Sequence, residues 1–460
     1  MKNVGKNILI SMLVILFIIF VILIIIANFT LVPFVTNIEI NESKRFEDKV
    51  IINIEVDNHF FKIDRDTWCF ITTSNKKPDI NDVNWVKASN GYCSFTTESG
   101  NYNIYLKDRY NNINDIYSQK VEINKILNVK LSKDTLYMYN GMTEKVTYEL
   151  VKIGNVSSNV KWESENENVA SVDENGNITA VNFGITYIKA ISDTGIIGKT
   201  KVIVSNLITK PIINTNKKYI SCRQFTKDEA DLLDQILFDR IDDAGFATRA
   251  GVIAAARFLT LEFSYRIHYF YENGRLNNYS PYKYVDGEGR YYHRGLYLSE
   301  AKFADLKATF VGPSIWGCDL QNYTDWGPYI TGRYYPNGLD CSGFVTWALL
   351  NGGFDIGDIG AGENINHNDL DDLGTKVYIT DELMNSGTVK VGDLIGLNGH
   401  MAILAGWDNE NYYIAESLNT TGGVVMTIVP KEKLVNNSIY KYIILMDDVY
   451  KKDGYYTNMW

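Results

Sequence analysis

The sequence is poor in cysteine and has no excess of positive charge. Five cysteines in 460 residues are too few for a small disulfide framework, and the odd number leaves at least one thiol unpaired within the chain. No Cys-x-x-Cys motif or Cys/His cluster indicates zinc, and we expect no cofactor. With 45 basic against 55 acidic residues, the formal charge of −10 argues against a nucleic-acid partner, which favours a basic surface. This length predicts about three folded units.

The N-terminal segment is the most apolar part of the chain. Residues 8–27 are apolar except for Ser11, and twenty such residues suffice to cross a bilayer as a helix. Lys2 and Lys6 precede this run, so the positive-inside rule places the short N-terminus in the cytoplasm and the rest of the chain outside. A cleaved signal peptide is the alternative, but bulky isoleucines stand where a cleavage site needs small residues. We expect residues 1–30 to be an uncleaved, single-pass signal anchor.

A first β-rich unit is expected over residues 31–126. Short strands, such as those over 50–56 and 102–106, alternate there with polar turns, which is typical of an immunoglobulin-like sandwich. Cys69 and Cys93 both lie in strand-like stretches, and a location outside the cell permits them to pair. We therefore expect these two cysteines to be structural.

A second β-rich unit over residues 127–205 has a more specific pattern. Asn175-Gly176 favours a type I′ hairpin turn between two alternating strands. Together with the stretches at 160–164 and 168–181, this pattern resembles the bacterial Ig-like domain of group 2. Such domains look like spacers or wall-binding modules on bacterial surface proteins, so the resemblance implies a fold rather than an activity.

A linker and a helical segment are expected before the C-terminal unit. Residues 206–218 are polar and lack periodicity, which predicts a linker. Thr226 and Glu229 form a capping box at the start of an apolar helical stripe, and a second helix is expected over about 248–262. The Tyr-rich remainder of residues 219–310 has little periodicity, and we expect the whole segment to pack on the domain that follows.

One cysteine, Cys341, lies at the predicted first turn of a short amphipathic helix. Apolar residues follow it at i+3, i+4, i+7 and i+8, and the glycines at 352–353 end the helix. A thiol at a helix N-terminus feels the positive end of the backbone dipole, which favours the nucleophilic thiolate. A buried structural cysteine is the alternative, since free cysteines are among the most buried residues.

A cysteine nucleophile needs a base and a group that orients the base. His400 is the best base candidate, because it follows a turn and opens an apolar strand over 401–405. If Ala405 pairs with Asn411 across a five-residue loop, His400 lies directly opposite Glu416 on one face of a sheet. The assignment depends on the turn, because another loop length would place another residue there. A carboxylate is well suited to hold the imidazole in the productive tautomer.

The C-terminal unit resembles the NlpC family of bacterial cell-wall peptidases and the related CHAP amidases. The resemblance covers roughly residues 313–430 and rests on three motifs: Asp340-Cys341-Ser342-Gly343-Phe344-Val345, Gly392-Asp393-Leu394 and Gly399-His400-Met401-Ala402-Ile403. It implies a papain-like α+β domain over residues 311–460, with Cys341 as nucleophile and His400 as base. The expected catalytic set is therefore Cys341, His400 and Glu416, with no metal.

The sequence departs from the NlpC pattern at two places. The third catalytic position is commonly His, Asn or Gln in that family, whereas Glu416 is closer to the CHAP pattern, which leaves the scissile bond open. The usual Pro-Tyr-x-Trp-Gly-Gly is replaced by residues 313–318, with Ser314 in place of the tyrosine. In NlpC enzymes that tyrosine helps to form the active site. The candidates for the same role here are Tyr323, Tyr329, Tyr334 and Tyr335. Cys318 is expected to be structural, because no helix start follows it, and Cys222 is a candidate partner.

The expected architecture is multidomain: a transmembrane anchor, two all-β Ig-like sandwiches and a C-terminal α+β papain-like domain. The expected function is that of a cell-surface cysteine endopeptidase cleaving an amide bond in peptidoglycan peptides. An N-acetylmuramoyl-L-alanine amidase, an acyl transferase and a non-catalytic adhesin or scaffold remain alternatives. The expected partners are peptidoglycan and, through the N-terminal helix, the cell membrane.

Overall fold

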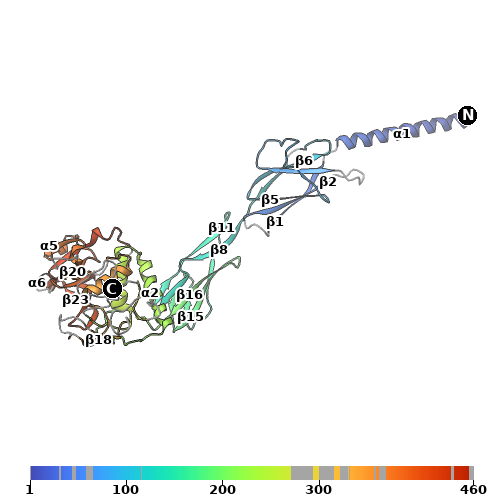
Figure 1. Cartoon of the computed structure of the whole chain (residues 1–460). Helices are drawn as coiled ribbons and strands as arrows, with labels where there is room; N and C mark the ends of the chain where they lie inside the picture. The colour runs from blue at the N-terminus through green and yellow to red at the C-terminus, as the bar shows by residue number, and fades with distance from the viewer. Residues whose placement is uncertain are drawn as a thin grey trace.

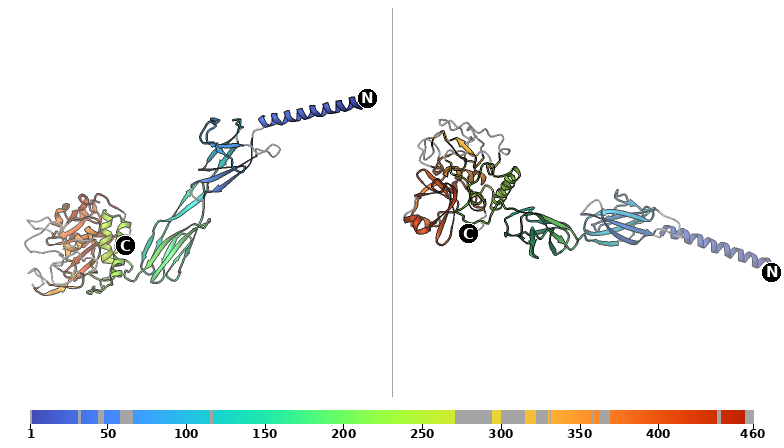
Figure 2. Two further views of the ribbon diagram at one scale, coloured as in Figure 1. Left: turned by 45° about the vertical axis from the view of Figure 1, so that its right-hand side comes forward. Right: turned by 90° about the horizontal axis from the view of Figure 1, so that it is seen from below.

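The computed structural model describes residues 2–30, 33–43, 48–57, 66–114, 117–270, 294–299, 315–321, 330, 332–356, 359–361, 369–436 and 440–454. An N-terminal helix, two β-sandwiches and a C-terminal unit built on one large sheet follow one another along an elongated molecule (Figure 1). The helix lies at one end and the C-terminal unit at the other, as both further views also show (Figure 2).

Helix α1 (Lys2–Thr30) contains the long apolar run of the sequence. Its window Ile8–Ile25 has a mean hydropathy of 3.7, and none of that window is buried in the protein. The helix has the length and composition of a membrane span, which a signal sequence near an N-terminus also has.

The first sandwich consists of a three-stranded and a four-stranded antiparallel sheet. Cys69 on β3 forms a disulfide with Cys93 on β5, which joins the two sheets and confirms that both cysteines are structural. Buried and less buried residues alternate along β2, because one face of the strand packs in the core. The sheet orders are β1 (Phe34–Glu42)–β2 (Val50–Asp57)–β5 (Tyr92–Thr97) and β4 (Val86–Lys87)–β3 (Thr67–Thr72)–β6 (Gly100–Asp108)–β7 (Tyr117–Val121).

The second sandwich is also Ig-like, and its last strand pairs in parallel with β9. Its sheet orders are β12 (Val160–Ser164)–β15 (Gly184–Ser192)–β16 (Ile197–Val204)–β9 (Thr135–Met138), β11 (Tyr148–Ile153)–β8 (Lys125–Leu131), and β10 (Thr143–Lys145)–β14 (Asn177–Ala180)–β13 (Ala170–Val172).

The hairpin around Asn175-Gly176 is present, but the type I′ turn predicted for it is wrong. A type I′ turn needs positive φ at both central residues. Within the turn, Gly176 has φ 80° and Asn175 has no positive φ. The N–H of Gly176 donates to the carbonyl of Asp173, and the Asp173 carboxylate accepts the N–H groups of Asn175 and Asn177. The aspartate therefore shapes a longer loop than the dipeptide alone predicts.

Residues 206–218 connect the sandwich to the C-terminal unit, but they are packed against it rather than free. Ile208 is buried and forms a β-bridge with Phe263. The Nζ of Lys217 donates to the carbonyl oxygens of Thr260 and Phe263 at 2.9 and 2.6 Å. The prediction of a linker missed these contacts because they join residues about fifty positions apart and leave no local pattern.

The C-terminal unit is built around a six-stranded antiparallel sheet. Its order is β19 (Thr375–Tyr378)–β24 (Tyr442–Leu445)–β20 (Leu394–Leu397)–β21 (His400–Trp407)–β22 (Asn411–Leu418)–β23 (Gly423–Pro430). The two faces bury separate hydrophobic clusters, and strand alternation sends neighbouring residues such as Ile403 and Leu404 into different ones. A short pair, β17 (Asp319–Gln321) and β18 (Tyr334–Pro336), lies outside this sheet.

Helices cover both faces of the large sheet. On one face lie α2 (Lys227–Ala244), α3 (Arg249–Arg257) with the π-helical turn Phe258–Glu262, and α4 (Cys341–Asn351). Leucines of α5 (Asp381–Asn385) and α6 (Lys431–Asn436) pack on the other face. The predicted capping box is confirmed, because Thr226 and Glu229 bond each other's backbone at the start of α2. Single 3₁₀ turns lie at Leu370–Asp372 and Met446–Asp448.

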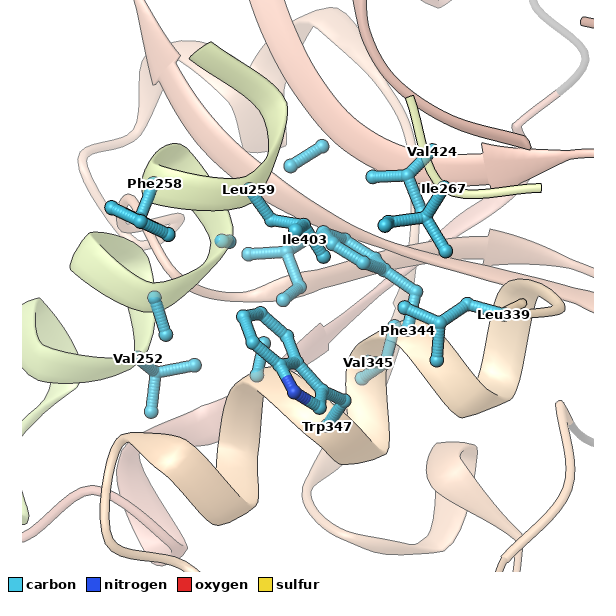
Figure 3. Packing of buried hydrophobic residues seen from close by; sticks show 14 of the residues in the cluster. Val252, Phe258, Leu259, Ile267, Leu339, Phe344, Val345, Trp347, Ile403 and Val424 are labelled. Atoms are coloured by element: carbon cyan, nitrogen blue, oxygen red, sulfur yellow. The ribbon is translucent and has the colours of Figure 1, made fainter. Parts of the chain in front are cut away.

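Helix α4 begins at Cys341 and ends at Gly352 as predicted, but it is not amphipathic. Ten of its eleven residues are buried. The helix lies between α3 and strands β21 and β22. Figure 3 shows Phe344 and Trp347 near side chains of α3 and β21, such as Val252 and Ile403. A helix that is buried all round carries apolar residues on every face, which masks the one-sided stripe expected of a surface helix.

The motif Gly392-Asp393-Leu394 has a structural role in this fold. Asp393 is buried, and its carboxylate accepts from Arg249 Nη1 at 2.6 Å. The same carboxylate accepts the backbone N–H groups of Met446 and Lys390, at 3.0 and 2.8 Å. Arg249 is the first residue of α3 and is also fully buried. One ion pair therefore ties the large sheet to the helical layer.

We predict that Asp393→Ala lowers the free energy of unfolding by about 3–5 kcal/mol, because it leaves the buried Arg249 guanidinium without its buried partner. Asp447→Asn is the matched control: Asp447 also bonds Arg249, at 2.6 Å, but is 58% exposed, so a loss below about 1 kcal/mol is expected. Chemical denaturation of both variants measures the difference. Equal, small losses would contradict a central role for the Asp393 pair.

Candidate active site

Cys341 is held at the first turn of a well-capped helix. The residue before it, Asp340, is the N-cap, and its carboxylate accepts the N–H of Gly343 at 2.6 Å. Cys341 is the free cysteine of the chain, since Cys69 pairs with Cys93 and Cys222 pairs with Cys318. The prediction that Cys318 is structural is confirmed, and its candidate partner Cys222 is the cysteine with which it pairs. A single thiol is therefore left for chemistry.

The loop that leads into Cys341 is fixed by backbone contacts. The N–H of Leu339 donates to the carbonyl of His268 at 2.9 Å, and the carbonyl of Leu339 accepts from the Ser417 hydroxyl at 2.6 Å. A Cβ on Gly338 would lie 2.0 Å from the carbonyl oxygen of His268, so glycine is required where the two backbones approach. These contacts set the position of the helix start.

His268 contributes its backbone rather than its ring to this region. The imidazole stacks on Tyr219 with ring centroids 4.5 Å apart, and its Nε2 lies 3.1 Å from the carbonyl oxygen of Ile220. Burial is the main cause that lowers the pKa of His268. The ring is thus committed to packing.

His400 is the first residue of β21 and reaches both predicted partners. Its Nε2 lies 2.8 Å from the Glu416 carboxylate. The Cys341 thiol is a hydrogen-bond partner of the same ring and also donates to the carbonyl of Gly399, at 3.8 Å. The structure thus brings together Cys341, His400 and Glu416.

The predicted strand register behind this contact is wrong, although the contact itself is present. Ile403 pairs with Ala415, not with Tyr413 as a pairing of Ala405 with Asn411 requires, and the register shifts again after Leu404. An offset of two residues keeps every side chain on its face, because the period of a strand is two. His400 and Glu416 therefore meet as diagonal rather than directly opposed neighbours.

Glu416 is the most enclosed member of the site. Its side chain is fully buried, and its carboxylate accepts from Thr427 Oγ1, from Tyr440 at 2.7 Å and from the His400 ring. Burial and the neighbouring carboxylate raise the pKa of Tyr440, so its hydroxyl stays protonated as a donor. A buried carboxylate with three donors is held in one orientation.

Sequence reasoning missed Thr427 and Tyr440. Thr427 lies on β23, where Glu416 pairs with Val425, so Thr427 is its diagonal neighbour on the same face. The register between β22 and β23 is therefore the information needed to predict the contact between Thr427 and Glu416. Tyr440 precedes β24, and its ring centroid lies 6.2 Å from that of His400. No local pattern marks Tyr440, because the contact depends on the order of strands in the sheet.

The tyrosines expected near the nucleophile are only partly described. Ser314, Tyr323 and Tyr329 lie outside the described residues. Tyr334 and Tyr335 lie in β18, and the Tyr335 hydroxyl accepts the N–H of Ile330 at 2.9 Å. Tyr440, which was not among the candidates, is the tyrosine that we find against the His400–Glu416 pair.

The electrostatics of the site favour a charged imidazole. Burial lowers the pKa of His400, but its hydrogen bonds with Cys341 and Glu416, together with the charge interactions with these groups, outweigh burial and raise the pKa to about 9. Most His400 side chains are therefore protonated at neutral pH. A charged imidazole between a thiol and a carboxylate favours the thiolate form that an activated cysteine needs.

Comparisons with known proteins identify the second sandwich. Residues 126–203 match the family model of the bacterial Ig-like domain (group 2), which confirms the resemblance found in the sequence. No curated protein matches the chain. The matched residues lie outside the C-terminal unit.

Parts of the chain are similar to solved structures, all with low TM-scores. The C-terminal 282-residue fragment of intimin, in complex with the intimin-binding domain of the translocated intimin receptor, is 16% identical and has a TM-score of 0.27, with 40% of this chain and 68% of that chain covered. Invasin, a bacterial integrin-binding protein, is 12% identical with a TM-score of 0.20, and 42% of each chain is covered. Domains 4 and 5 of the S-layer protein SbsC are 19% identical with a TM-score of 0.18, covering 23% of this chain and 66% of that chain.

We predict that the imidazole of His400 titrates near pH 9 in the wild type and at lower pH in Cys341→Ala, which removes one of the two groups that raise its pKa. NMR titration of protein with labelled histidine measures both values. Burial lowers the pKa of His268, and His268 should titrate at the same pH in both proteins, which makes it an internal control. An unchanged His400 titration in the variant would show that the thiol does not act on the ring.

Proposed function

We propose that the C-terminal unit is a papain-like cysteine hydrolase of the NlpC/CHAP type that cleaves an amide bond in peptidoglycan peptides. The observation that carries the proposal is the hydrogen-bonded series from Cys341 through His400 to Glu416, with the thiol at a helix N-terminus. Nucleophile, base and orienting carboxylate come from three separate elements, which is the arrangement that covalent catalysis requires.

The residues support a two-step reaction. The Cys341 thiolate attacks the carbonyl carbon of the amide, and His400 delivers a proton to the leaving nitrogen as the C–N bond breaks. This step leaves a thioester on Cys341 and a neutral imidazole. His400 then takes a proton from water as the oxygen attacks the thioester, and the thiolate leaves. Glu416 holds the ring in place during both proton transfers.

The helix start also supplies a donor for the negative oxygen of the intermediate. Asp340 already accepts the N–H of Gly343. In the described part of the chain, the N–H of Cys341 donates to no other backbone group. An orphan amide beside the attacking sulfur is well placed to stabilise an oxyanion, and the helix dipole adds to the effect.

Two kinds of amide bond in peptidoglycan are candidates for cleavage. We favour an endopeptidase that cuts within the peptide stems. An N-acetylmuramoyl-L-alanine amidase is the second candidate, because the carboxylate beside His400 is the CHAP rather than the NlpC arrangement.

We infer that the protein acts at the outer face of the cell membrane, with α1 as a single-pass anchor and both Ig-like units as a stalk. The length and hydropathy of α1, the bacterial Ig-like module and the two disulfides support this topology, since disulfides persist in oxidising surroundings. A non-catalytic adhesin would share these features. The presence of both Cys341 and His400 favours the hydrolase, since a non-catalytic scaffold has no chemical need for a nucleophile and a base.

We predict that the detergent-solubilised full chain releases new amine termini from purified cell wall and that Cys341→Ala releases none, because the substitution removes the nucleophile. Asp447→Asn, on the exposed surface, is the control and should retain the wild-type rate. Mass spectrometry of the fragments distinguishes a peptide cut from an amidase cut and hydrolysis from acyl transfer. No release by the wild type, or equal release by Cys341→Ala, would rule out the hydrolase.

We predict that wild-type activity falls as the pH rises through about 9, because His400 loses the proton that it delivers to the leaving amine. Glu416 is one of the two groups that raise this pKa, so in Glu416→Gln the alkaline limb of the activity should move to lower pH. A pH–rate profile of both proteins measures the shift. Coincident alkaline limbs would mean that Glu416 does not act on the charge of His400.

A further inference from the structure

Strand β22 contacts both halves of the candidate site. Glu416 and Ser417 are adjacent on this strand, so their side chains leave opposite faces of the sheet. Glu416 holds His400 on one face. On the other face, the Ser417 hydroxyl donates to the carbonyl oxygen of Leu339 at 2.6 Å, and Leu339 lies two residues before Cys341.

We propose that Ser417 is a positioning residue that sets the distance between the Cys341 thiol and the His400 ring. The inference rests on the proposed hydrolase function. One rigid strand then carries the group that orients the base and the group that places the nucleophile. The position of the Cys341 thiol relative to the His400 ring is thereby fixed.

The contact at Leu339 is enclosed and short. Ser417 and Leu339 are both fully buried, so water cannot replace the hydroxyl if it is removed. The N–H of Leu339 is bonded to His268, so the Leu339 peptide is held from both sides. Loss of the Ser417 hydroxyl leaves a buried carbonyl without this donor, and the loop moves to find another. Helix α4 starts two residues later and moves with it.

A positioning role for Ser417 predicts a change in the pKa of His400 as well as a change in stability. His400 is protonated up to about pH 9 partly because of the hydrogen bond and charge of Cys341. A shift of the thiol away from the ring weakens both effects, whereas the Glu416 contact on the opposite face remains. A variant that displaces Cys341 therefore lowers the pKa of His400 even though neither residue has changed.

The test uses the full chain in detergent with labelled histidine and compares Ser417→Ala with Ser417→Thr, which keeps the hydroxyl. Thr260→Val is the matched control, because Thr260 is buried and its hydroxyl donates to the carbonyl of Ala256 at 2.8 Å, away from the site. Three quantities are measured for each protein: the Tm, the pKa of His400 by NMR, and the release of amine from cell wall.

We expect Ser417→Ala to lower the pKa of His400 and to slow release by about 10²-fold, the scale of a 1 Å misplacement. Ser417→Thr should restore both quantities. Thr260→Val should lower the Tm by a similar amount and leave both at wild-type values. If Ser417→Ala does not fold, Ser417→Cys keeps the volume with a weaker donor and should give a smaller shift in the same direction.

A Ser417→Ala protein that loses Tm like Thr260→Val but keeps the wild-type pKa and rate would overturn the proposal. A wild type that releases no amine would instead overturn the hydrolase function. In that case a lowered pKa of His400 in Ser417→Ala would still support the positioning role. The two failures are therefore distinguishable.

Discussion

The site depends on one buried charge. Glu416 is fully enclosed in the sheet, where an isolated carboxylate would cost several kcal/mol. Its three donors are His400 on β21, Thr427 on β23 and Tyr440, which lies two residues before β24. Strand order and side-chain direction must agree for these donors to converge. The orientation of the imidazole therefore follows from the topology of the whole sheet.

A second buried pair, Arg249–Asp393, joins that sheet to the helices. The helices and the sheet share one hydrophobic core, because Leu233 of α2, Phe344 of α4 and Ile403 of β21 belong to the same cluster of buried residues. The second sandwich also contacts the helices, since Arg240 on α2 donates to the carbonyl of Tyr137 on β9 at 2.9 Å. The second sandwich and the C-terminal unit are therefore joined by specific hydrogen bonds.

The candidate site could be predicted from the sequence only as far as local pattern reaches. Asp340 before Cys341 marks a helix start, and a strand that opens at His400 marks a base within reach. The partner Glu416 was found with a wrong register, because a two-residue offset preserves the face of every side chain. Thr427, Tyr440 and Ser417 could not be found this way, since their contacts require the pairing of β23, the place of β24 and the packing of α4.

Local chemistry determined the helix limits, the caps, the strand alternation and the two disulfide pairs that match expectation. These features depend on neighbours in the chain or on a choice among five cysteines. The tertiary structure alone decided that α4 is buried all round, that residues 206–218 are packed and that one strand serves both halves of the site. The physical reason is that burial and hydrogen bonding act between residues far apart in the chain, where periodicity carries no information.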